Sequence, residues 1–501
     1  MARPGFGVLR SDWRASLPEP AATRVDHLDQ SDLQGNVLCG YGNDFCHALY
    51  LFVRVNAPLA GRRWVGELAA QVTDAMPWAA GHRPSATVNV ALSHAGLAAL
   101  GVPRPVLGSF PEEFRMGMAK RGSELGDLDR SAPANWEQEL RGEAHALVTV
   151  TARSEPALER RVQALLEYLA RSDGALELAY VQRADLLPPQ EGDLPRREHF
   201  GFADGFSQPA IKGNAGPTQR DGMGTPTKRG RWRNVAPGEF VLGYKGEDGV
   251  AAQRPAEPLR RSGSFMVVRK LEQHVERFHD FLAETAGADP LAQRKLGARL
   301  VGRWQDGRSL VLDLNPYPRD PREGPGRREE LRRINRFLYH AQDADGLRCP
   351  LGAHVRRANP RDEFGGQFGW HGKLTKRHRI IRRGMPYDDR QARDGGGRGL
   401  MFVCYQASIE RQFEVIQKNW LNDGDAFWLG AEKDPLTIRQ APAVGVPDWP
   451  EPAFGDGRTT IQGDPPTFVR GGLPFVTTRG GGYYFTPGIG ALRALASAYW
   501  L

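Results

Sequence analysis

The stretch His47-Ala-Leu-Tyr-Leu-Phe-Val-Arg-Val55 decides the fold of the first part of the chain. Its run of apolar residues predicts a buried strand. Residues 62–76 follow with apolar side chains at helical spacing, namely Trp64, Leu68 and Val72. This part of the chain therefore begins with a strand and a helix that cover one another.

The same reasoning extends outward along the chain. Further strands are predicted at 86–92, 145–151 and 176–181, with an amphipathic helix at 156–170. A strand at 263–270 and a helix at 272–286 echo the opening pair, and the last part continues with a strand at 399–406, a helix at 409–421 and a strand at 482–487. The sequence thus predicts an α+β protein built from two similar halves.

The predicted domain boundaries follow from this pattern. Residues 1–30 have no periodicity and are expected to form an N-terminal arm, 31–215 the first half and 216–501 the second half. Between the halves, residues 187–238 are polar and rich in Gly and Pro. A connection of this length without regular structure is usually functional.

Composition excludes several classes of protein. The chain has 501 residues, 40% of them hydrophobic and 25% charged, as in ordinary globular proteins. The formal charge of +8 is spread over the whole length, so we expect no nucleic-acid partner. Four scattered cysteines favour a reducing compartment. With no apolar run long enough for a signal peptide or a membrane span, we expect a cytoplasmic protein without a membrane partner.

The first segment that could carry chemistry is Gly201-Phe-Ala-Asp204-Gly-Phe-Ser-Gln-Pro209. Two glycines flank a carboxylate that lies between aromatic residues, so Asp204 is expected to be partly desolvated. Desolvation raises the pKa of a carboxyl group toward the range in which a general acid or base works. The alternative interpretation is a turn that the Asp204 side chain caps.

Two later segments carry a histidine and an arginine. His354 follows Cys349-Pro-Leu-Gly-Ala, and three arginines come within seven residues after it. A single histidine cannot hold zinc, but it can be the axial ligand of a haem iron, with arginines paired to the haem propionates. In His378-Arg-Ile-Ile-Arg382, alternation predicts a short strand that carries a guanidinium able to stabilise developing negative charge. Structural roles remain the alternatives: a hydrogen-bonded histidine and a basic strand edge.

Together these segments resemble one family, the DyP-type (dye-decolorizing) haem peroxidases, and in particular its longer, non-exported members. Gly201-Phe-Ala-Asp204-Gly205 matches the family's distal Gly-x-x-Asp-Gly motif, and the surroundings of His354 match its proximal motif. Arg382 lies in a segment similar to the one that carries the family's distal arginine. The resemblance runs from about residue 30 to the end of the chain.

The resemblance implies a fold of two ferredoxin-like halves, with haem b held non-covalently in the C-terminal half. It implies His354 as the axial ligand of the iron, Arg361 or Arg356 at a propionate, and Leu400 and Phe402 in the distal pocket. Asp204 and Arg382 would be the catalytic residues that act on hydrogen peroxide. The chain is thereby identified as a peroxidase that oxidises bulky aromatic donors, such as dyes and phenols, through a ferryl intermediate. The resemblance is also compatible with a homo-oligomer. The alternative is a non-enzymatic haem carrier or sensor.

Two details are not set by the motifs. An axial histidine normally donates its second N–H to an acceptor, and we expect Glu410 or Glu414 in that place. Bulky donors would be oxidised by electron transfer through aromatic residues near the surface. The candidates for this relay are Trp370, Trp420, Tyr387 and Tyr405.

Overall fold

The computed structural model describes residues 28–498 apart from thirteen short gaps. These gaps are residues 80, 143, 190–195, 206, 215–221, 228–231, 316–332, 365–372, 391–396, 431, 438–457, 464–465 and 471–473. The expected N-terminal arm therefore lies almost wholly outside the described residues, and so does Trp370.

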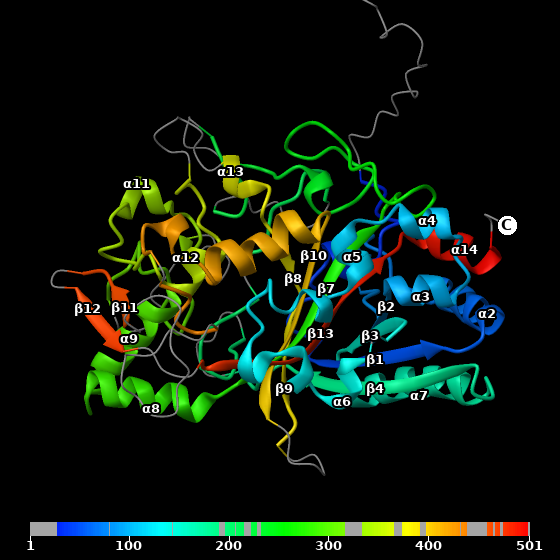
Figure 1. The fold of residues 1–501 in the computed structure, drawn as a ribbon, viewed down its shortest axis with the longest axis horizontal. Coiled ribbons are helices and arrows are strands. Elements are labelled where there is room, and N and C mark those ends of the chain that lie inside the picture. Colours follow the sequence, from blue (N-terminus) through cyan, green and yellow to red (C-terminus); the bar gives the residue numbers. More distant parts are fainter. Residues whose placement is uncertain are drawn as a thin grey trace, which may run out of the picture.

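The first half is an antiparallel sheet with helices on one face (Figure 1). Its strands, paired in the order β4-β1-β3-β2, are β1 (His47–Val55), β2 (Ala86–Leu92), β3 (Ala146–Ala152) and β4 (Leu176–Asp185). Helices α2 (Pro58–Ala69) and α7 (Glu155–Ala170) contribute apolar side chains to the core on that face. All four strands lie where the sequence predicts them. Helix α2 is shifted toward the N-terminus, because Thr73, beyond its end, hydrogen-bonds Val88 in β2.

The second half repeats this arrangement. Its main strands are β7 (Ser264–Gln273), β8 (Ile381–Arg382), β10 (Arg398–Gln406) and β13 (Val476–Thr486), in the order β13-β7-β10-β8, and β9 (Met385–Asp388) also pairs with β10. If β7, β8, β10 and β13 are numbered one to four along the chain, the order is four, one, three, two. The first half has the same order, β4-β1-β3-β2. A βαββαβ unit with this order is ferredoxin-like, so the predicted pair of α+β halves is confirmed.

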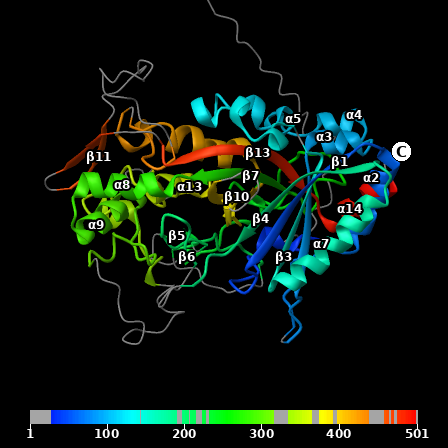
Figure 2. The same ribbon diagram turned by 90° about the horizontal axis from the view of Figure 1, so that it is seen from below.

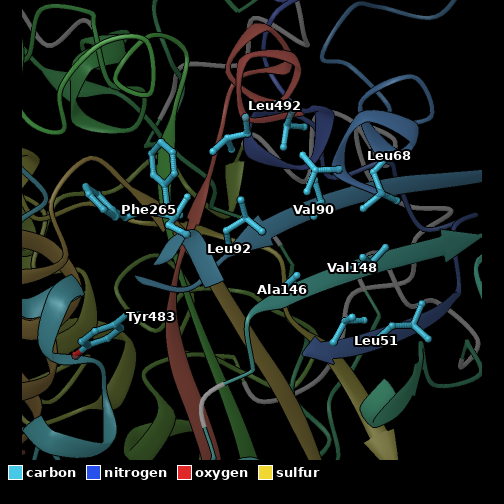
Figure 3. Packing of buried hydrophobic residues seen from close by; sticks show 14 of the residues in the cluster. Leu51, Leu68, Val90, Leu92, Ala146, Val148, Phe265, Tyr483 and Leu492 are labelled. Atoms are coloured by element: carbon cyan, nitrogen blue, oxygen red, sulfur yellow. The ribbon is translucent and has the colours of Figure 1, made fainter. Parts of the chain in front are cut away.

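Strand β13 joins the two halves into one sheet. It pairs with β7 over most of its length, and its Phe485 pairs with Leu92 at the end of β2. Figure 2 shows β13 crossing the middle of the molecule toward the first half. The following helix, α14 (Ile489–Ser497), packs against α2. Side chains from both halves therefore share one core, in which Phe265 and Tyr483 lie in the same cluster as Leu92 and Val148 (Figure 3).

The helices of the second half lie at the end of the molecule away from α2 (Figure 1). They are α8 (Val275–Ala286), α9 (Pro290–Val301), α12 (His354–Ala358) and two consecutive π-helical segments, η7 (Ile409–Glu414) and η8 (Ile416–Leu421). Helix α9 was not predicted. The wide turn of the π-helical segments carries the chain through the region predicted as one α-helix.

The remaining elements are short. The helices are α1 (Gly35–Leu38), α3 (His94–Ala99), α4 (Arg104–Gly108), α5 (Glu112–Met116), η2 (Ala119–Arg121), η3 (Asp129–Ser131), η4 (Pro133–Asn135), α6 (Gln138–Arg141), η5 (Pro237–Glu239), α11 (Tyr339–Asp343), α13 (Lys373–Lys376) and η9 (Asp425–Phe427). The strands are β5 (Thr225–Pro226), β6 (Trp232–Arg233), β11 (Arg458–Ile461) and β12 (Thr467–Arg470). In the part of the chain that the structure describes, every helix is too short or too polar to span a bilayer.

Candidate active site

His354 opens helix α12 and is held by a buried aspartate. Its Nδ1 lies 2.9 Å from Oδ2 of Asp434, a residue with no exposed side-chain surface. Burial lowers the pKa of His354, but the Asp434 carboxylate outweighs it and the net pKa is raised. Because Nδ1 is occupied, the imidazole can offer Nε2 to a ligand, as an axial histidine does.

The expectation that Glu410 or Glu414 accepts this hydrogen bond is wrong. Glu414 instead receives hydrogen bonds from Arg121 and from the Tyr483 hydroxyl. Glu410, four residues earlier, lies at the start of η7, where its backbone N–H contacts Glu113.

The loop that carries Asp434 is fastened to helix α12. Oδ1 of Asp434 accepts hydrogen bonds from the backbone N–H groups of Leu436 and Thr437 and from the Thr437 hydroxyl. Arg357, one turn after His354, donates to the carbonyl oxygens of Glu432 and Trp420. The histidine and its acceptor are therefore positioned by the same short helix.

Asp204 is presented by a tight loop. Gly201 and Gly205 on either side adopt φ values of +92° and +82°, which residues with a Cβ rarely reach. The backbone of the loop is tied to its neighbours, since Asp204 N–H donates to the Arg196 carbonyl and Ala203 N–H to that of Gln305. The carboxylate is thereby aimed in one direction.

Asp204 and Arg382 form a close pair. Arg382 Nη1 donates to Asp204 Oδ1 at 2.9 Å, and Gln208 accepts the backbone N–H of Arg382. Burial raises the pKa of Asp204, but the Arg382 charge and the Gly205 N–H outweigh it, so the net pKa lies below the ordinary aspartate value. The expectation that burial raises the pKa of Asp204 is therefore wrong, and the group is ionised at neutral pH.

His354 lies close enough to this pair for the charges of both partners to act on it. Exposed fractions of 30%, 33% and 37% are found for the side chains of His354, Asp204 and Arg382. Burial is nevertheless the largest influence on the pKa of both His354 and Asp204, and the charges of Asp204 and Arg382 both act on His354. The three groups are therefore close in the interior of the fold, although each side chain keeps some accessible surface.

Leu400 and Phe402 lie on the strand beside Arg382. Together with Cys404 they occupy every second position of β10, and Cys404 pairs directly with Arg382 on β8. Side chains two residues apart share one face of a strand, so both point to the same side of the sheet as Arg382. Both are half-buried, as expected for an apolar lining next to the distal pair.

The two arginines predicted at a propionate differ in their surroundings. All five N–H donors of Arg356 are used, by Asp343, Glu363 and backbone carbonyl groups. Arg361 is also buried, but its Nη1 donates only to carbonyl oxygens, and the described residues place no carboxylate in ion-pairing distance of it. Of the two arginines, Arg361 is therefore the better candidate to pair with a propionate.

Arg361 belongs to a buried group of cations with Arg303 and Arg379. Burial, together with repulsion from a neighbouring arginine in each case, lowers the pKa of Arg303 to about 9 and those of Arg361 and Arg379 to about 10. Arg379 donates to the carbonyl groups of Ser207 and Met223. Buried positive charge requires an anion. A haem, with two propionates and an open position for one imidazole, fits this donor set.

A cavity of about 390 Å³ adjoins the distal pair on the side of the first half. Its lining includes Gly205, Gln208 and Arg382 from the distal region and Asn89 from the first half. Its lining carries many amide and hydroxyl groups, which suit a small polar molecule.

The aromatic residues named as a relay are buried wherever they are described. Trp420, Tyr387 and Tyr405 expose 6% of their surface or less, so none of them can itself meet a donor at the surface. Trp428, which the sequence did not single out, is 93% exposed. It follows Phe427, whose ring packs 5.5 Å from that of Phe364.

Comparison with known proteins agrees with this fold and site. Residues 61–177 match the family model of the DyP dimeric alpha+beta barrel domain, and residues 245–427 match that of the C-terminal part of Dyp-type peroxidases. The dye-decolorizing peroxidase msp1 of Mycetinis scorodonius is 29% identical over 94% of this chain and 88% of its own length. The multifunctional dye peroxidase DyP2 of an Amycolatopsis species is 27% identical over 96% of this chain and 98% of its own.

Solved structures give the same result. An ancestral D-type dye decolorizing peroxidase superposes with a TM-score of 0.71 at 29% identity, covering 93% of this chain and 99% of the other. A dye-decolorizing peroxidase in complex with 2,6-dimethoxyphenol superposes with a TM-score of 0.71 at 26% identity, covering 94% and 100%.

The chain is therefore an α+β haem enzyme of the barrel type, and it belongs to the DyP-type (dye-decolorizing) peroxidase family. As a member of it, the protein is a haem peroxidase that oxidises aromatic donors with hydrogen peroxide.

Proposed function

We propose that His354 is the axial ligand of haem b and that Asp204 and Arg382 act on hydrogen peroxide on the opposite face. The observation that supports this most directly is an imidazole, fixed by Asp434, that lies close enough to the Asp204–Arg382 ion pair for both charges to act on its pKa. Arg361 would hold a propionate, and Leu400 and Phe402 would keep the distal side narrow. When bound, haem would supply the iron to which peroxide binds and the two electrons that reduce it. Aromatic donors would later return these two electrons to the haem.

The chemistry of the distal pair follows from its ionisation. As a carboxylate, Asp204 accepts the proton of one peroxide oxygen and returns it to the other. The O–O bond then breaks with release of water, and Arg382 stabilises the negative charge that develops on the departing oxygen. Peroxide would reach the pair through the adjoining cavity, which is large enough for it and carries amide and hydroxyl groups on its lining.

Non-covalent attachment is proposed from the cysteines. Cys349 is the nearest in sequence to His354, but it is buried and its pKa is raised to about 12, so its thiol stays protonated. All four cysteines are free thiols. Free thiols persist in a reducing compartment, which supports the proposal of a cytoplasmic protein.

This function is tested on the purified holoprotein with an anthraquinone dye. We expect a Soret band, a pyridine haemochrome spectrum of haem b and dye bleaching that requires hydrogen peroxide. Bulky donors would meet the protein at its surface, where Trp428 is exposed. A haem carrier or sensor would instead show the Soret band without peroxide turnover, and that result would reject the peroxidase.

Replacing Asp434 with Asn should weaken haem retention without abolishing it. The amide can still accept the Nδ1 hydrogen bond, but it carries no charge to make the imidazole a stronger ligand. Loss of such a partner typically costs 10–100-fold in metal affinity. We expect haem to transfer to excess apomyoglobin about 10–100-fold faster than from the wild type. Asp425→Asn, at an exposed position of the same segment, is the control. Equal transfer rates in Asp434→Asn and wild type would contradict the assignment.

A further inference from the structure

Glu198 lies six residues before Asp204 and fastens the loop that carries it. Its two carboxyl oxygens accept the backbone N–H groups of Phe200 and Phe202, each at 2.9 Å. Its own backbone N–H donates to the Phe202 carbonyl, and its carbonyl accepts Gly201 N–H. One side chain thus closes a ring over the turn that leads to Asp204.

The same carboxyl group anchors the loop to the central sheet. Gln273 Nε2 donates to Glu198 Oε2 at 2.5 Å. Gln273 is buried at the end of β7, where it pairs with Val476 of β13. The Glu198 carboxyl is therefore the link between the distal loop and the two strands that run through the middle of the molecule.

Gln273 also has an unused acceptor. Its Oε1 is buried and finds no hydrogen-bond donor among the described residues. Half a turn of the amide would exchange Nε2 and Oε1, and Oε1 would then accept a proton carried by Glu198. The neutral form of Glu198 can thus donate to Gln273 while it still accepts from the loop.

The surroundings favour that neutral form. Burial, with a smaller contribution from Asp204, raises the pKa of Glu198 to about 7, although the bonds from Gln273, Phe200 and Phe202 oppose the shift. The titratable groups on either side of Gln273 in the chain are already engaged, since Glu272 accepts from Arg479 and His274 bonds Thr477. On the loop itself, Arg197 donates to the Gly201 carbonyl, and His199, whose pKa burial lowers, bonds the Tyr387 carbonyl.

We propose that Glu198 is a positioning residue for the reaction with peroxide, and that in its neutral form it holds the distal loop closed so that Asp204 meets Arg382. The proposal rests on the proposed function of Asp204. It assigns to Glu198 no contact with peroxide or haem.

The direction of the pH effect follows from linkage. A carboxyl whose pKa is higher in the closed loop than in an open one stabilises the closed loop at low pH. This contribution is complete below the free value of 4.5 and is lost as pH rises to about 7. The equilibrium constant for opening of the loop should therefore increase by up to about 300-fold between pH 4.5 and pH 7. Above pH 7 it should change little.

Hydrogen exchange at the amides of Phe200 and Phe202 in the holoprotein measures this opening without peroxide. After correction for intrinsic rates, wild-type protection should decrease from pH 4.5 to 7. Glu198→Gln, an uncharged side chain of the same size, should remove this dependence. Glu198→Ala should lose protection at every pH, and its reaction with peroxide in stopped flow should be about 10–100-fold slower, since small misplacements of a catalytic group cost this much.

The Gln variant distinguishes positioning from mere folding. At pH 5 it should react with peroxide at close to the wild-type rate, whereas Glu198→Ala should not. Glu113→Ala removes another buried glutamate, on α5, and should leave both the exchange and the peroxide reaction unchanged. Should Glu198→Ala not fold, Glu198→Gln still decides the matter through the pH dependence of exchange.

Two results would overturn the proposal. One is wild-type protection of Phe200 and Phe202 in Glu198→Ala, and the other is a pH dependence of exchange that survives in Glu198→Gln. If instead Asp204→Asn reacts with peroxide at the wild-type rate, the proposed function of Asp204 fails. The exchange data would then still report whether Glu198 holds the loop.

Discussion

Replacing His354 with Ala is expected to leave a protein that binds little or no haem. Nε2 of His354 is the ligand proposed for the iron, and the buried arginines can hold only the propionates. We expect the Soret absorbance of protein purified with added haem to fall to a small fraction of the wild-type value. Added imidazole should restore part of it by occupying the vacated space. His340→Ala removes an exposed histidine on α11 and should retain full absorbance.

This experiment needs a second variant because Asp434 would be left buried without its partner. An uncompensated buried charge typically costs about 3–5 kcal/mol of stability. In the double variant His354→Ala, Asp434→Asn this charge is absent, so loss of haem can be separated from loss of folding by circular dichroism. Full Soret absorbance in the double variant would show that another residue binds the iron.

Asp204→Asn and Arg382→Leu should keep haem but react slowly with hydrogen peroxide. Loss of a positioned general base typically costs about 10²–10⁴-fold, and loss of a fixed charge-stabilising donor about 10²–10³-fold. Stopped-flow mixing with peroxide measures the second-order rate constant. Because the two side chains share a 2.9 Å hydrogen bond, the double variant should be faster than the product of the single effects implies.

The pH profile of the same rate provides a further check. The pKa of Asp204 is lowered, so the base form is present at neutral pH and is lost only as pH falls through that lowered value. The apparent pKa of the acid limb of the wild-type profile should therefore lie below the ordinary aspartate value of about 3.9. This limb should be absent in Asp204→Asn. Arg390→Leu, on the surface, is the control. Wild-type rates in both distal variants would remove the pair from the mechanism.

The strands and the distal loop could be predicted because their signals are local. Runs such as residues 47–55 and 399–406 are apolar enough to indicate buried strands without knowledge of their partners. The glycines around Asp204 similarly indicate a tight turn, and the turn is present at Gly201 and Gly205. Arg382 was expected on a short strand and lies on β8.

The acceptor of His354 could not be predicted, because it depends on packing between distant segments. Asp434 lies 80 positions after His354, and its local pattern, Asp-Pro-Leu-Thr437, indicates only a capped turn. The turn is observed, but nothing in it shows which imidazole the second carboxylate oxygen meets. Glu198 is a similar case, since its link to Gln273 joins positions 75 residues apart.

The place of β13 has a consequence for the order in which the protein is made. Thr73 and Gln34 bond the edge of β2 at Val88 and Val90. The end of β2 at Leu92 and one face of α2 are instead completed by β13 and α14, which come last in the second half. An emerging chain would expose the end of β2 and the apolar face of α2, a surface prone to association, until β13 and α14 have been made. We therefore expect the first half, expressed alone as residues 28–185, to associate more readily than the same half in the full chain.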